Sequence, residues 1–320
     1  MRRAPIACIA AALIAGCGRN AMPLPVAVPD AARVAPAARG GSWMSAEAAK
    51  QNLLYVSDYE TDDVYAYSYP DGKLSGVLRG ILKTFIYPTG LCTDTAGDVF
   101  IPDSGNAGIL VYAHGGTKVV RTLHDAGEYP YSCVVDPKSG DLAVVDLESV
   151  SGPGGVSIYA QAAGRPRFYN HGFTYKYFFA AYDADGNLFV DAAQDIPSAP
   201  FEFLERRAKG KQLEQVTLDA DIAIPGGVVW DGQYVAVEDS KTATIDRFAI
   251  SNLQGKKAGS VTLSEAKFPA QFLVADGHVV AAEFHGKRVG FWAYPGGGAP
   301  AKTIDGFGYP FGIALSDAPH

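Results

Sequence analysis

The sequence lacks the short motifs that most often mark an enzyme. It contains no G-x-S-x-G, H-E-x-x-H, C-x-x-C or Walker A pattern, each of which would set a nucleophile, a metal or a phosphate in a defined loop. Its six histidines are scattered and do not have the spacing of zinc ligands. We therefore expect no catalytic residues, no metal site and no cofactor, and the sequence favours a binding protein over an enzyme.

Charge and long apolar runs are also scarce. Only 19% of the 320 residues are charged, and acidic residues outnumber basic ones by 34 to 27, which gives a net charge of −7. Such a chain is unsuited to nucleic acid, because phosphate contacts need Lys and Arg, but it suits cationic partners. No stretch beyond the N-terminal segment approaches the roughly 18 apolar residues of a membrane-spanning helix.

Cysteine is rare, with four in the chain. Cys8 and Cys17 lie in the N-terminal segment, and Cys92 and Cys133 lie one repeat apart near the starts of two predicted strands. An exported protein could join the latter two in a disulfide. Both sit inside apolar runs, however, which favours buried free thiols.

The N-terminus has the pattern of an export signal. Arg2 and Arg3 form a basic start, and an apolar run over residues 6–15 follows that is too short to span a bilayer. Ile14-Ala15-Gly16-Cys17 then resembles a bacterial lipobox, which implies cleavage before Cys17 and lipidation of its thiol. The alternative is an ordinary secretory signal with a chance cysteine.

A corner built around proline recurs along the chain. The copies are roughly 41 to 44 residues apart, and one gap of about twice that length holds a degenerate corner near Tyr177 and Phe178; this period is typical of repeat folds. Each corner begins a short strand. The five clear copies are Tyr87 to Gly90, Tyr129 to Ser132, Ile224 to Gly227, Phe268 to Gln271 and Tyr309 to Gly312.

Each corner leads into a hairpin. A turn containing glycine follows the first strand, as at Gly97 and Gly140. A fully apolar second strand comes next, such as Val99–Ile101 or Leu142–Val145, and an unbroken apolar run predicts burial on both faces. A third strand with an aromatic residue and a more polar fourth strand complete the unit.

The two ends of the chain fit a closed ring. Leu53–Val56 has the pattern of a second strand, but no first strand precedes it in the sequence. Tyr309–Leu315 has the pattern of a corner and a first strand, but no second strand follows it. Pairing the two would complete one blade and close the seam of the ring. The sequence therefore predicts an all-β, six-bladed β-propeller with four-stranded blades, closed by the C-terminal strand against the first N-terminal strands.

The repeat resembles the NHL family of propellers. Pro88 to Leu91, Gly97 to Ile101 and Asp103 to Asn106 carry the resemblance, and the periodic pattern covers roughly residues 50–317. The basic residue that usually follows the Asn is replaced by Ala107, and the fourth unit departs further. Propellers of this kind include enzymes and binding platforms, so the resemblance implies a fold and leaves the function open.

An acidic residue ends nearly every second strand, and aromatic residues occupy the corners. The two sets should share one face around the propeller axis, and we predict a ligand-binding ring there for a cation, a basic peptide or a sugar. Alternatively, each acid accepts hydrogen bonds within its own loop. The predicted ring comprises Asp58, Asp103, Asp146, Asp191, Glu238, Glu283, His285, Tyr87, Tyr131 and Tyr309.

An enzymatic alternative is a metal-dependent lactonase or hydrolase that resembles the SMP-30/gluconolactonase propellers. That resemblance implies a divalent metal at the axis, held by carboxylate and Asn side chains at the starts of the inner strands. None of the matching positions carries such a side chain, so the metal site is not reproduced. These positions are Thr89, Tyr131, Phe178, Gly226, Ala270 and Phe311.

Together these patterns predict a lipid-anchored, non-enzymatic binding module of the cell envelope. We expect a signal peptide over residues 1–16, an Ala/Pro-rich tether over residues 17–50 and the propeller over residues 51–320. The expected partner is a small cationic ligand, a sugar or an envelope protein, and contact with the membrane is expected only through the lipid. The expected location is the outer membrane and periplasm or the cell surface.

Overall fold

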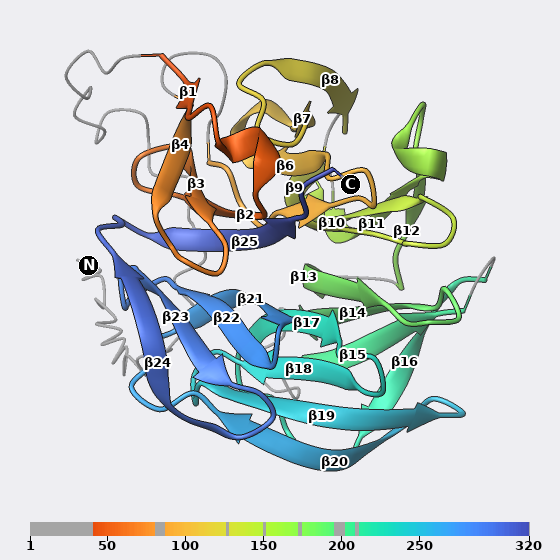
Figure 1. Cartoon of the computed structure of the whole chain (residues 1–320). Helices are drawn as coiled ribbons and strands as arrows, with labels where there is room; N and C mark the ends of the chain where they lie inside the picture. Colours follow the sequence, from red (N-terminus) through yellow and green to blue (C-terminus); the bar gives the residue numbers. More distant parts are fainter. Residues whose placement is uncertain are drawn as a thin grey trace, which may run out of the picture. The chain divides into compact units, whose positions relative to one another are not determined.

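The computed structural model describes residues 41–80, 87–125, 128–149, 152–171, 175–194, 202–208 and 211–319. The predicted signal peptide, Cys17 and the tether up to residue 40 lie outside these residues. The described part is built from β-strands, with short 3-10 turns at Ala48–Lys50, Ser104–Asn106 and Ala160–Ala162. Its sheets are arranged around a common centre as a β-propeller (Figure 1), which confirms the predicted fold class.

The first sheet joins the two ends of the described chain. It runs in the order β1 (Trp43–Met44), β4 (Leu74–Arg79), β3 (Asp63–Ser68), β2 (Leu53–Asp58) and β25 (Pro310–Ser316). β25 pairs antiparallel with β2, so that Val56 lies opposite Ile313. The C-terminal strand therefore closes the ring as the sequence predicts, and β1 adds a fifth strand at the outer edge.

Three further sheets have four antiparallel strands each. One holds β5 (Cys92–Thr93), β6 (Val99–Asp103), β7 (Gly108–Tyr112) and β8 (Val119–His124). The next holds β9 (Glu128–Val135), β10 (Leu142–Ser149), β11 (Gly152–Tyr159) and β12 (Arg167–Tyr169). The last holds β21 (Pro269–Ala275), β22 (His278–Glu283), β23 (Arg288–Ala293) and β24 (Gly297–Asp305).

The remaining strands form one sheet of eight. It contains β13 (Tyr175–Tyr182), β14 (Leu188–Gln194), β15 (Glu202–Arg207) and β16 (Leu213–Leu218), followed by β20 (Gln254–Thr262), β19 (Thr244–Ser251), β18 (Val235–Asp239) and β17 (Pro225–Trp230). β16 and β20 pair in parallel at Thr217 with Gln254 and Leu218 with Gly255. Two four-stranded repeats are thereby merged through their outer strands.

The prediction of six separate blades therefore needs correction, because the described chain forms five hydrogen-bonded sheets. The six predicted corners do lead into six inner strands: β25, β5, β9, β13, β17 and β21, each in contact with the next around the ring. The difference arises at the periphery, where the hairpin between β19 and β20 reaches β16 and Thr217 N donates to the Leu253 carbonyl over 2.9 Å. This pairing uses backbone groups, so no pattern of side chains in the sequence predicts it.

The core lies in layers between neighbouring sheets. All six residues of β2 are buried, as expected for an apolar second strand with a sheet on either side. One layer packs Leu53, Tyr55 and Val64 of the first sheet against Val99 and Ile101 of the next. The five predicted hairpin turns between first and second strands place their glycines at φ values between 72° and 94°, where a side chain would be strained.

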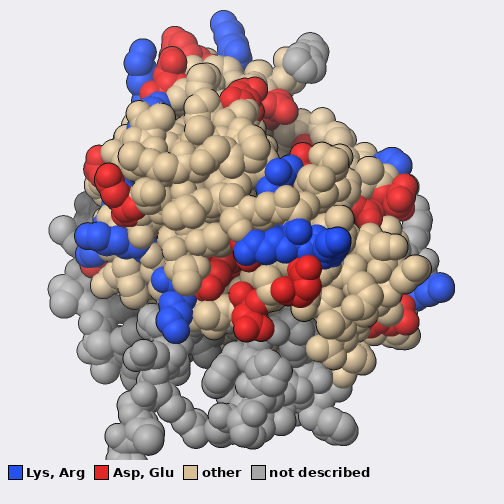
Figure 2. Space-filling view, turned by 90° about the horizontal axis from the view of Figure 1, so that it is seen from below, with Lys and Arg blue, Asp and Glu red and all other residues tan. Residues whose placement is uncertain are grey.

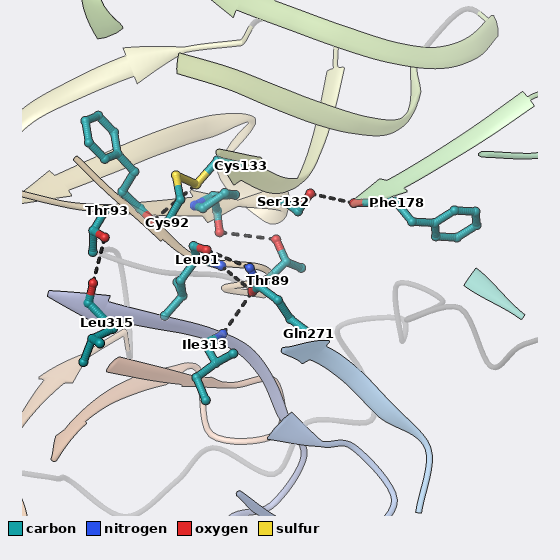
Figure 3. The surroundings of a disulfide bond; sticks show 12 residues. Thr89, Leu91, Cys92, Thr93, Ser132, Cys133, Phe178, Gln271, Ile313 and Leu315 are labelled. Carbon is teal, nitrogen blue, oxygen red and sulfur yellow. Dashed lines mark hydrogen bonds between the residues drawn. A yellow bond between two sulfur atoms is a disulfide. The ribbon is translucent and has the colours of Figure 1, made fainter. Parts of the chain in front are cut away.

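The expectation of free thiols at Cys92 and Cys133 is wrong. The two residues form a disulfide, with their Cα atoms 5.5 Å apart (Figure 3). Cys92 lies on β5 and Cys133 on β9, the equivalent inner strands of adjacent repeats. Inner strands converge towards the axis, so side chains at matching positions meet. Burial in an apolar run and disulfide formation are therefore compatible, and the disulfide links two sheets.

A second link joins three inner strands through one side chain. The amide of Gln271 on β21 donates to the Leu91 carbonyl over 2.8 Å and accepts from the Leu91 N–H at 2.9 Å and the Ile313 N–H at 3.0 Å (Figure 3). Leu91 directly precedes β5, and Ile313 lies on β25. The side chain thus holds together the strands on both sides of the ring closure.

Candidate functional site

All six predicted acids are buried. Four of them lie at or next to the ends of their second strands, but Asp146 and Asp191 lie within β10 and β14, which continue to Ser149 and Gln194. Asp58, Asp103, Asp146, Glu238 and Glu283 have no exposed surface, and Asp191 is 4% exposed. A buried carboxylate needs hydrogen bonds, an ion pair or a proton, because solvent no longer stabilises its charge. The six acids differ in whether hydrogen bonds, an ion pair or a proton compensates for their burial.

Asp58 is held entirely by backbone donors. Its Oδ1 accepts from the N–H groups of Glu60 and Tyr309, both at 3.0 Å, and its Oδ2 accepts from Gly308 N–H at 2.7 Å. These bonds connect the loop after β2 to the corner before β25. Asp58 therefore holds the closing corner of the ring in place.

Glu283 has a similar structural role in the last repeat. Its Oε1 lies 2.6 Å from Nε of Arg288, and its Oε2 accepts from the Lys267 N–H at 2.8 Å. Both carboxylate oxygens are thus engaged within one repeat. The hydrogen-bonding alternative raised from the sequence describes Asp58 and Glu283 well.

Asp103 and Asp146 accept hydrogen bonds from nearby side chains. Asp103 Oδ2 accepts from Asn106 Nδ2 at 2.7 Å, and Asp146 Oδ2 accepts from Ser157 Oγ at 2.8 Å. Each donor follows its acid within the same repeat. Binding of an external ligand by these two residues stays a prediction.

Asp191 and Glu238 are different, because each has one buried oxygen without a donor in the described part of the chain: Oδ2 of Asp191 and Oε1 of Glu238. The other oxygens accept from Phe179 N–H at 2.6 Å and Gly227 N–H at 3.2 Å. Burial raises the pKa of both carboxyls well above the usual range, and the nearby acids Asp239, Asp191 and Glu283 raise that of Glu238 further. Burial therefore favours the protonated form of both groups.

The predicted aromatic residues form a contiguous cluster with two partners that the prediction omitted. Tyr87 stacks on Tyr59 at 4.8 Å between ring centroids, and Tyr309 stacks on Phe284 at 4.9 Å. Tyr59 and Phe284 are 6.4 Å apart and connect the two pairs. A signal for both was present, since each directly follows one of the predicted acids, Asp58 or Glu283.

His285 extends this cluster outwards. Its ring stacks on Phe268 at 4.9 Å and lies 5.3 Å from Phe284. Lys287 adds a cation, with its Nζ 4.7 Å from the centre of the Tyr309 ring. His285 and Lys287 are exposed, and most of the rings around them are half-buried. We call the set Tyr59, Tyr87, Phe268, Phe284, His285 and Tyr309 the aromatic face.

Tyr131 lies in a buried layer that continues from the aromatic face. It is 2% exposed and makes edge contacts with Phe178, Phe179 and Phe311, and Phe311 touches Phe284. Burial raises the pKa of Tyr131, and the neighbouring acid Asp191 raises it further. The hydroxyl of Tyr131 therefore stays protonated, and the residue supports the face from within.

The same layer occupies positions where the lactonase resemblance would require metal ligands. Tyr131, Phe178 and Phe311 pack there as aromatic rings, and Thr89 Oγ1 lies 3.3 Å from the Pro130 carbonyl, to which it donates. Among the described residues no group of three or more His, Cys, Asp or Glu could hold a metal ion. The side chains at these positions do not fit a divalent metal.

Charge on the visible surface is mixed. Figure 2 shows the molecule from the side on which β19 and β20 lie in Figure 1, with a short band of Lys and Arg between groups of Asp and Glu. Uncharged side chains cover much of the rest of the described surface in this view. A helix capable of crossing a membrane is not found in the described residues.

Comparisons with known proteins show similarity in structure alone. No family model and no curated protein matches the sequence. The structure of a nidogen/laminin complex contains a chain that matches with a TM-score of 0.66 and 12% identity, covering 84% of this chain and all of that one. A protein of unknown function from Bacteroides caccae matches with a TM-score of 0.62 and 12% identity, covering 83% and 99% of the two chains. At such identity the likeness shows the fold alone, which is that of a β-propeller.

Proposed function

We propose that this protein is an exported, lipid-anchored propeller that binds a partner protein of the cell envelope through the aromatic face. The observation that carries the proposal is the stacked, half-exposed cluster around Phe284, with Lys287 and His285 beside it. Aromatic side chains on a rigid support are the residues that dominate protein–protein interfaces, because they bury a large area and lose little conformational entropy.

Burial of the acids favours a protein partner over a small cation. The carboxylates of Asp58 and Glu283 are saturated by internal donors, and burial disfavours the ionised forms of Asp191 and Glu238. The accessible groups are therefore aromatic rings and a lysine, which suit an apolar segment with an acidic neighbour. The chain of similar fold noted above comes from a nidogen/laminin complex, which supports a protein-binding role for this architecture.

Two observations support export and anchoring. Residues 1–17 have the pattern of a signal peptide that ends in a lipidated cysteine. The Cys92–Cys133 disulfide fits an oxidising compartment, since disulfides are rare in the reducing cytosol. The NHL-like repeat pattern is compatible with this role and does not by itself identify a partner.

Cross-linking in intact cells followed by affinity purification of the full-length protein tests the proposal. We expect a specific envelope protein to be recovered with the wild type and its recovery to fall at least about tenfold in Phe284→Ala and Tyr309→Ala, as for interface hot spots. Trp43→Ala is the matched control, because Trp43 is an aromatic residue that is 42% exposed on the outer strand β1.

The variants must keep their folded structure for the comparison to count. Thermal unfolding of each purified variant checks this directly. Equal recovery of the partner with wild type, Phe284→Ala and Tyr309→Ala would contradict the proposed interface. Recovery that falls equally in Trp43→Ala would also contradict it.

A further inference from the structure

The outer edges of the repeats differ in whether another strand covers them. β1 pairs with the outer strand β4, and the outer strands β16 and β20 pair with each other. The outer strand β24 is touched at Gly298, whose carbonyl accepts from the Ser264 N–H at 2.9 Å. β8 and the three-residue β12 end their sheets, and no strand of the described chain pairs with their outer sides. Outer edges of this propeller therefore accept added strands, and β8 is the long edge that is open to one.

The backbone of β8 directs alternate groups to this open side. The Asp125 N–H, just after the strand, donates to the Ala107 carbonyl over 3.0 Å. Bonded and non-bonded pairs alternate along an antiparallel ladder, so Leu123 and Arg121 also direct their backbone groups to β7. The N–H and carbonyl of Thr122 consequently face the open edge, where the described residues provide no hydrogen-bond partner for them.

The side chains of β8 do little to protect its edge. Val119 and Val120 are 39% and 58% exposed. The strand contains no proline, and Arg121 is its one Lys or Arg. A register shift opposite Tyr112 leaves residues 121–124 as the regular part of the edge. Edge strands are commonly protected by proline, by charged side chains or by a covering segment, so the sparse protection of β8 is consistent with a docking strand.

A groove of about 770 Å³ lies beside this edge, between the second and third repeats. Residues 121–125 line one side of it, and residues 163–166 with Phe168 line the other. Phe168 is 41% exposed. A strand added to β8 would direct every second side chain towards the third repeat, and so into the groove. None of the lining residues belongs to the aromatic face, so this surface is independent of the proposed function.

The basic side chains around the groove favour an acidic occupant. Arg121 and Arg165 line it, and Arg167 is exposed on β12. None of these three arginines forms an ion pair within the part of the chain that the structure describes. The one acid on the lining, Asp125, is 3% exposed and already accepts a hydrogen bond from Ser157 Oγ. Carboxylates of an occupant would therefore find guanidinium groups without a carboxylate partner.

Charge also distinguishes among the possible occupants. A second copy that paired antiparallel at β8, centred on Arg121, would place two arginines opposite each other, and like charges at such positions are destabilising. The predicted tether that precedes the described residues carries Arg19, Arg33 and Arg39 against the single acid Asp30. Both of these occupants are basic where the groove is basic. An acidic segment of another protein has the complementary charge.

We propose that β8 takes up an extended, acidic segment of another protein as a fifth strand of its sheet. Backbone groups of the segment would pair with the N–H and carbonyl of Thr122. Acidic side chains at alternate positions would lie against Arg121 and Arg165, and aliphatic side chains would pack on Phe168. In strand addition of this kind the main-chain hydrogen bonds supply affinity, and the alternate side chains supply specificity.

Fluorescence anisotropy with the full-length protein in detergent provides the test. The probe is a labelled heptapeptide of sequence TVEVEVT, which combines strand propensity with two acids. One control peptide is TVKVKVT, and the other is TVEVEVT with N-methyl groups on two adjacent central residues, which block both of its hydrogen-bonding edges. We expect saturable binding of the probe below about 1 mM and binding at least about tenfold weaker for both controls.

Three variants assign the contacts. Thr122→Pro removes an N–H that faces the open side, a change that edge strands tolerate, and it should weaken binding of TVEVEVT at least about tenfold. Arg165→Glu reverses the charge of an exposed side chain, and it should weaken binding of TVEVEVT while strengthening that of TVKVKVT. Lys256→Glu, at an exposed lysine on β20, is the matched control and should change neither.

Defined results would overturn the proposal. They are no saturable binding of TVEVEVT up to about 1 mM, equal binding of either control peptide, or unchanged binding in a folded Thr122→Pro variant. A dimer of the wild type that Thr122→Pro abolishes would identify a second copy as the occupant and would also overturn it. Thermal unfolding checks each variant, and if Thr122→Pro does not fold, the N-methylated peptide and Arg165→Glu still decide the matter.

Discussion

The buried acids occupy equivalent positions in the repeats but have different physical roles. Asp58 accepts hydrogen bonds from backbone groups on two sides of the ring closure. Glu238 instead has one oxygen without a described donor, and burial raises the pKa of its carboxyl. The negative charge of Asp58 should therefore stabilise the folded protein. Ionisation of Glu238 should destabilise it.

Asp58→Asn should reduce the free energy of unfolding by roughly 2–4 kcal/mol. The substitution removes the charge and turns one acceptor into a donor that faces backbone N–H groups. Urea denaturation followed by circular dichroism measures the change. Asp71→Asn, an exposed position in a turn, should change stability by less than about 0.5 kcal/mol. Equal stabilities of the two variants would contradict the role assigned to Asp58.

Glu238→Gln should become increasingly stabilising relative to the wild type as the pH rises. The pKa of Glu238 is raised in the folded protein, whereas in the unfolded chain it has an ordinary value near 4.3. Above that value the unfolded state binds fewer protons than the folded state, so the wild type loses stability with increasing pH until the folded carboxyl ionises. Glutamine removes this loss because it does not titrate.

Urea denaturation at pH 5, 6, 7 and 8 measures the stability difference between Glu238→Gln and the wild type. The difference should grow over this range. Glu265→Gln, at an exposed glutamate, provides the matched comparison and should show a nearly constant difference. A difference that shrinks with pH would show that Glu238 is ionised in the folded protein.

At the scale of elements, a disulfide and side-chain hydrogen bonds connect neighbouring inner strands in addition to apolar packing. Cys92 and Cys133 connect β5 to β9, Ser132 Oγ on β9 donates to the Phe178 carbonyl on β13 over 2.6 Å, and Gln271 connects β21 to β25 and to the residue before β5. Among the described residues, the inner strands of neighbouring sheets do not pair with one another in a ladder. Side chains therefore supply many of the links around the axis, beside a backbone hydrogen bond from the Gly90 N–H to the Tyr131 carbonyl at 2.8 Å.

Replacing both cysteines, as Cys92→Ala with Cys133→Ala, should lower the free energy of unfolding by about 3–4 kcal/mol. The disulfide closes a loop with a sequence separation of 41 residues, and the unfolded chain gains the corresponding entropy when the link is removed. The midpoint of urea denaturation measures the loss, and addition of dithiothreitol to the unfolded wild type should reproduce it. A variant as stable as the oxidised wild type would contradict a stabilising role for the disulfide.

Gln271→Ala should destabilise the protein by roughly 2–3 kcal/mol. It leaves the Leu91 N–H and carbonyl and the Ile313 N–H without their partner near the ring closure. Thermal and urea unfolding measure this effect. Gln233→Ala, at an exposed glutamine in a turn, is the matched control and should be nearly neutral. Similar behaviour of both variants would argue that the ring closes without help from Gln271.

For the whole molecule, the proposed lipid anchor leads to a prediction about where the propeller is located in the cell. Cys17→Ala should move the protein from the membrane fraction to the soluble fraction, because the proposed link to the bilayer is the lipid on that thiol. Cell fractionation with immunoblotting measures the distribution, and Cys8→Ala serves as the control within the signal. Retention of Cys17→Ala in the membrane fraction at the wild-type level would contradict the anchor.

The fold class could be predicted from the sequence, because the repeat period, the glycine turns and the apolar second strands are local properties of the chain. The closure of the ring could also be predicted, since Leu53–Val56 and Tyr309–Leu315 are complementary remainders of one unit. The acids and corner aromatics were found from their repeated positions. Asp58, Asp103, Glu238 and Glu283 lie at or next to strand ends, whereas Asp146 and Asp191 lie within β10 and β14.

Which of these residues contact one another became clear from the packing of the folded chain. The Cys92–Cys133 disulfide, the merging of two repeats through β16 and β20, and the contacts of Gln271 join segments far apart in the sequence. The different environments of Asp58 and Glu238 likewise depend on donors from other segments. Local patterns specify strands and turns, whereas hydrogen-bond partners, burial and pKa depend on the packing of distant segments, which no single repeat encodes.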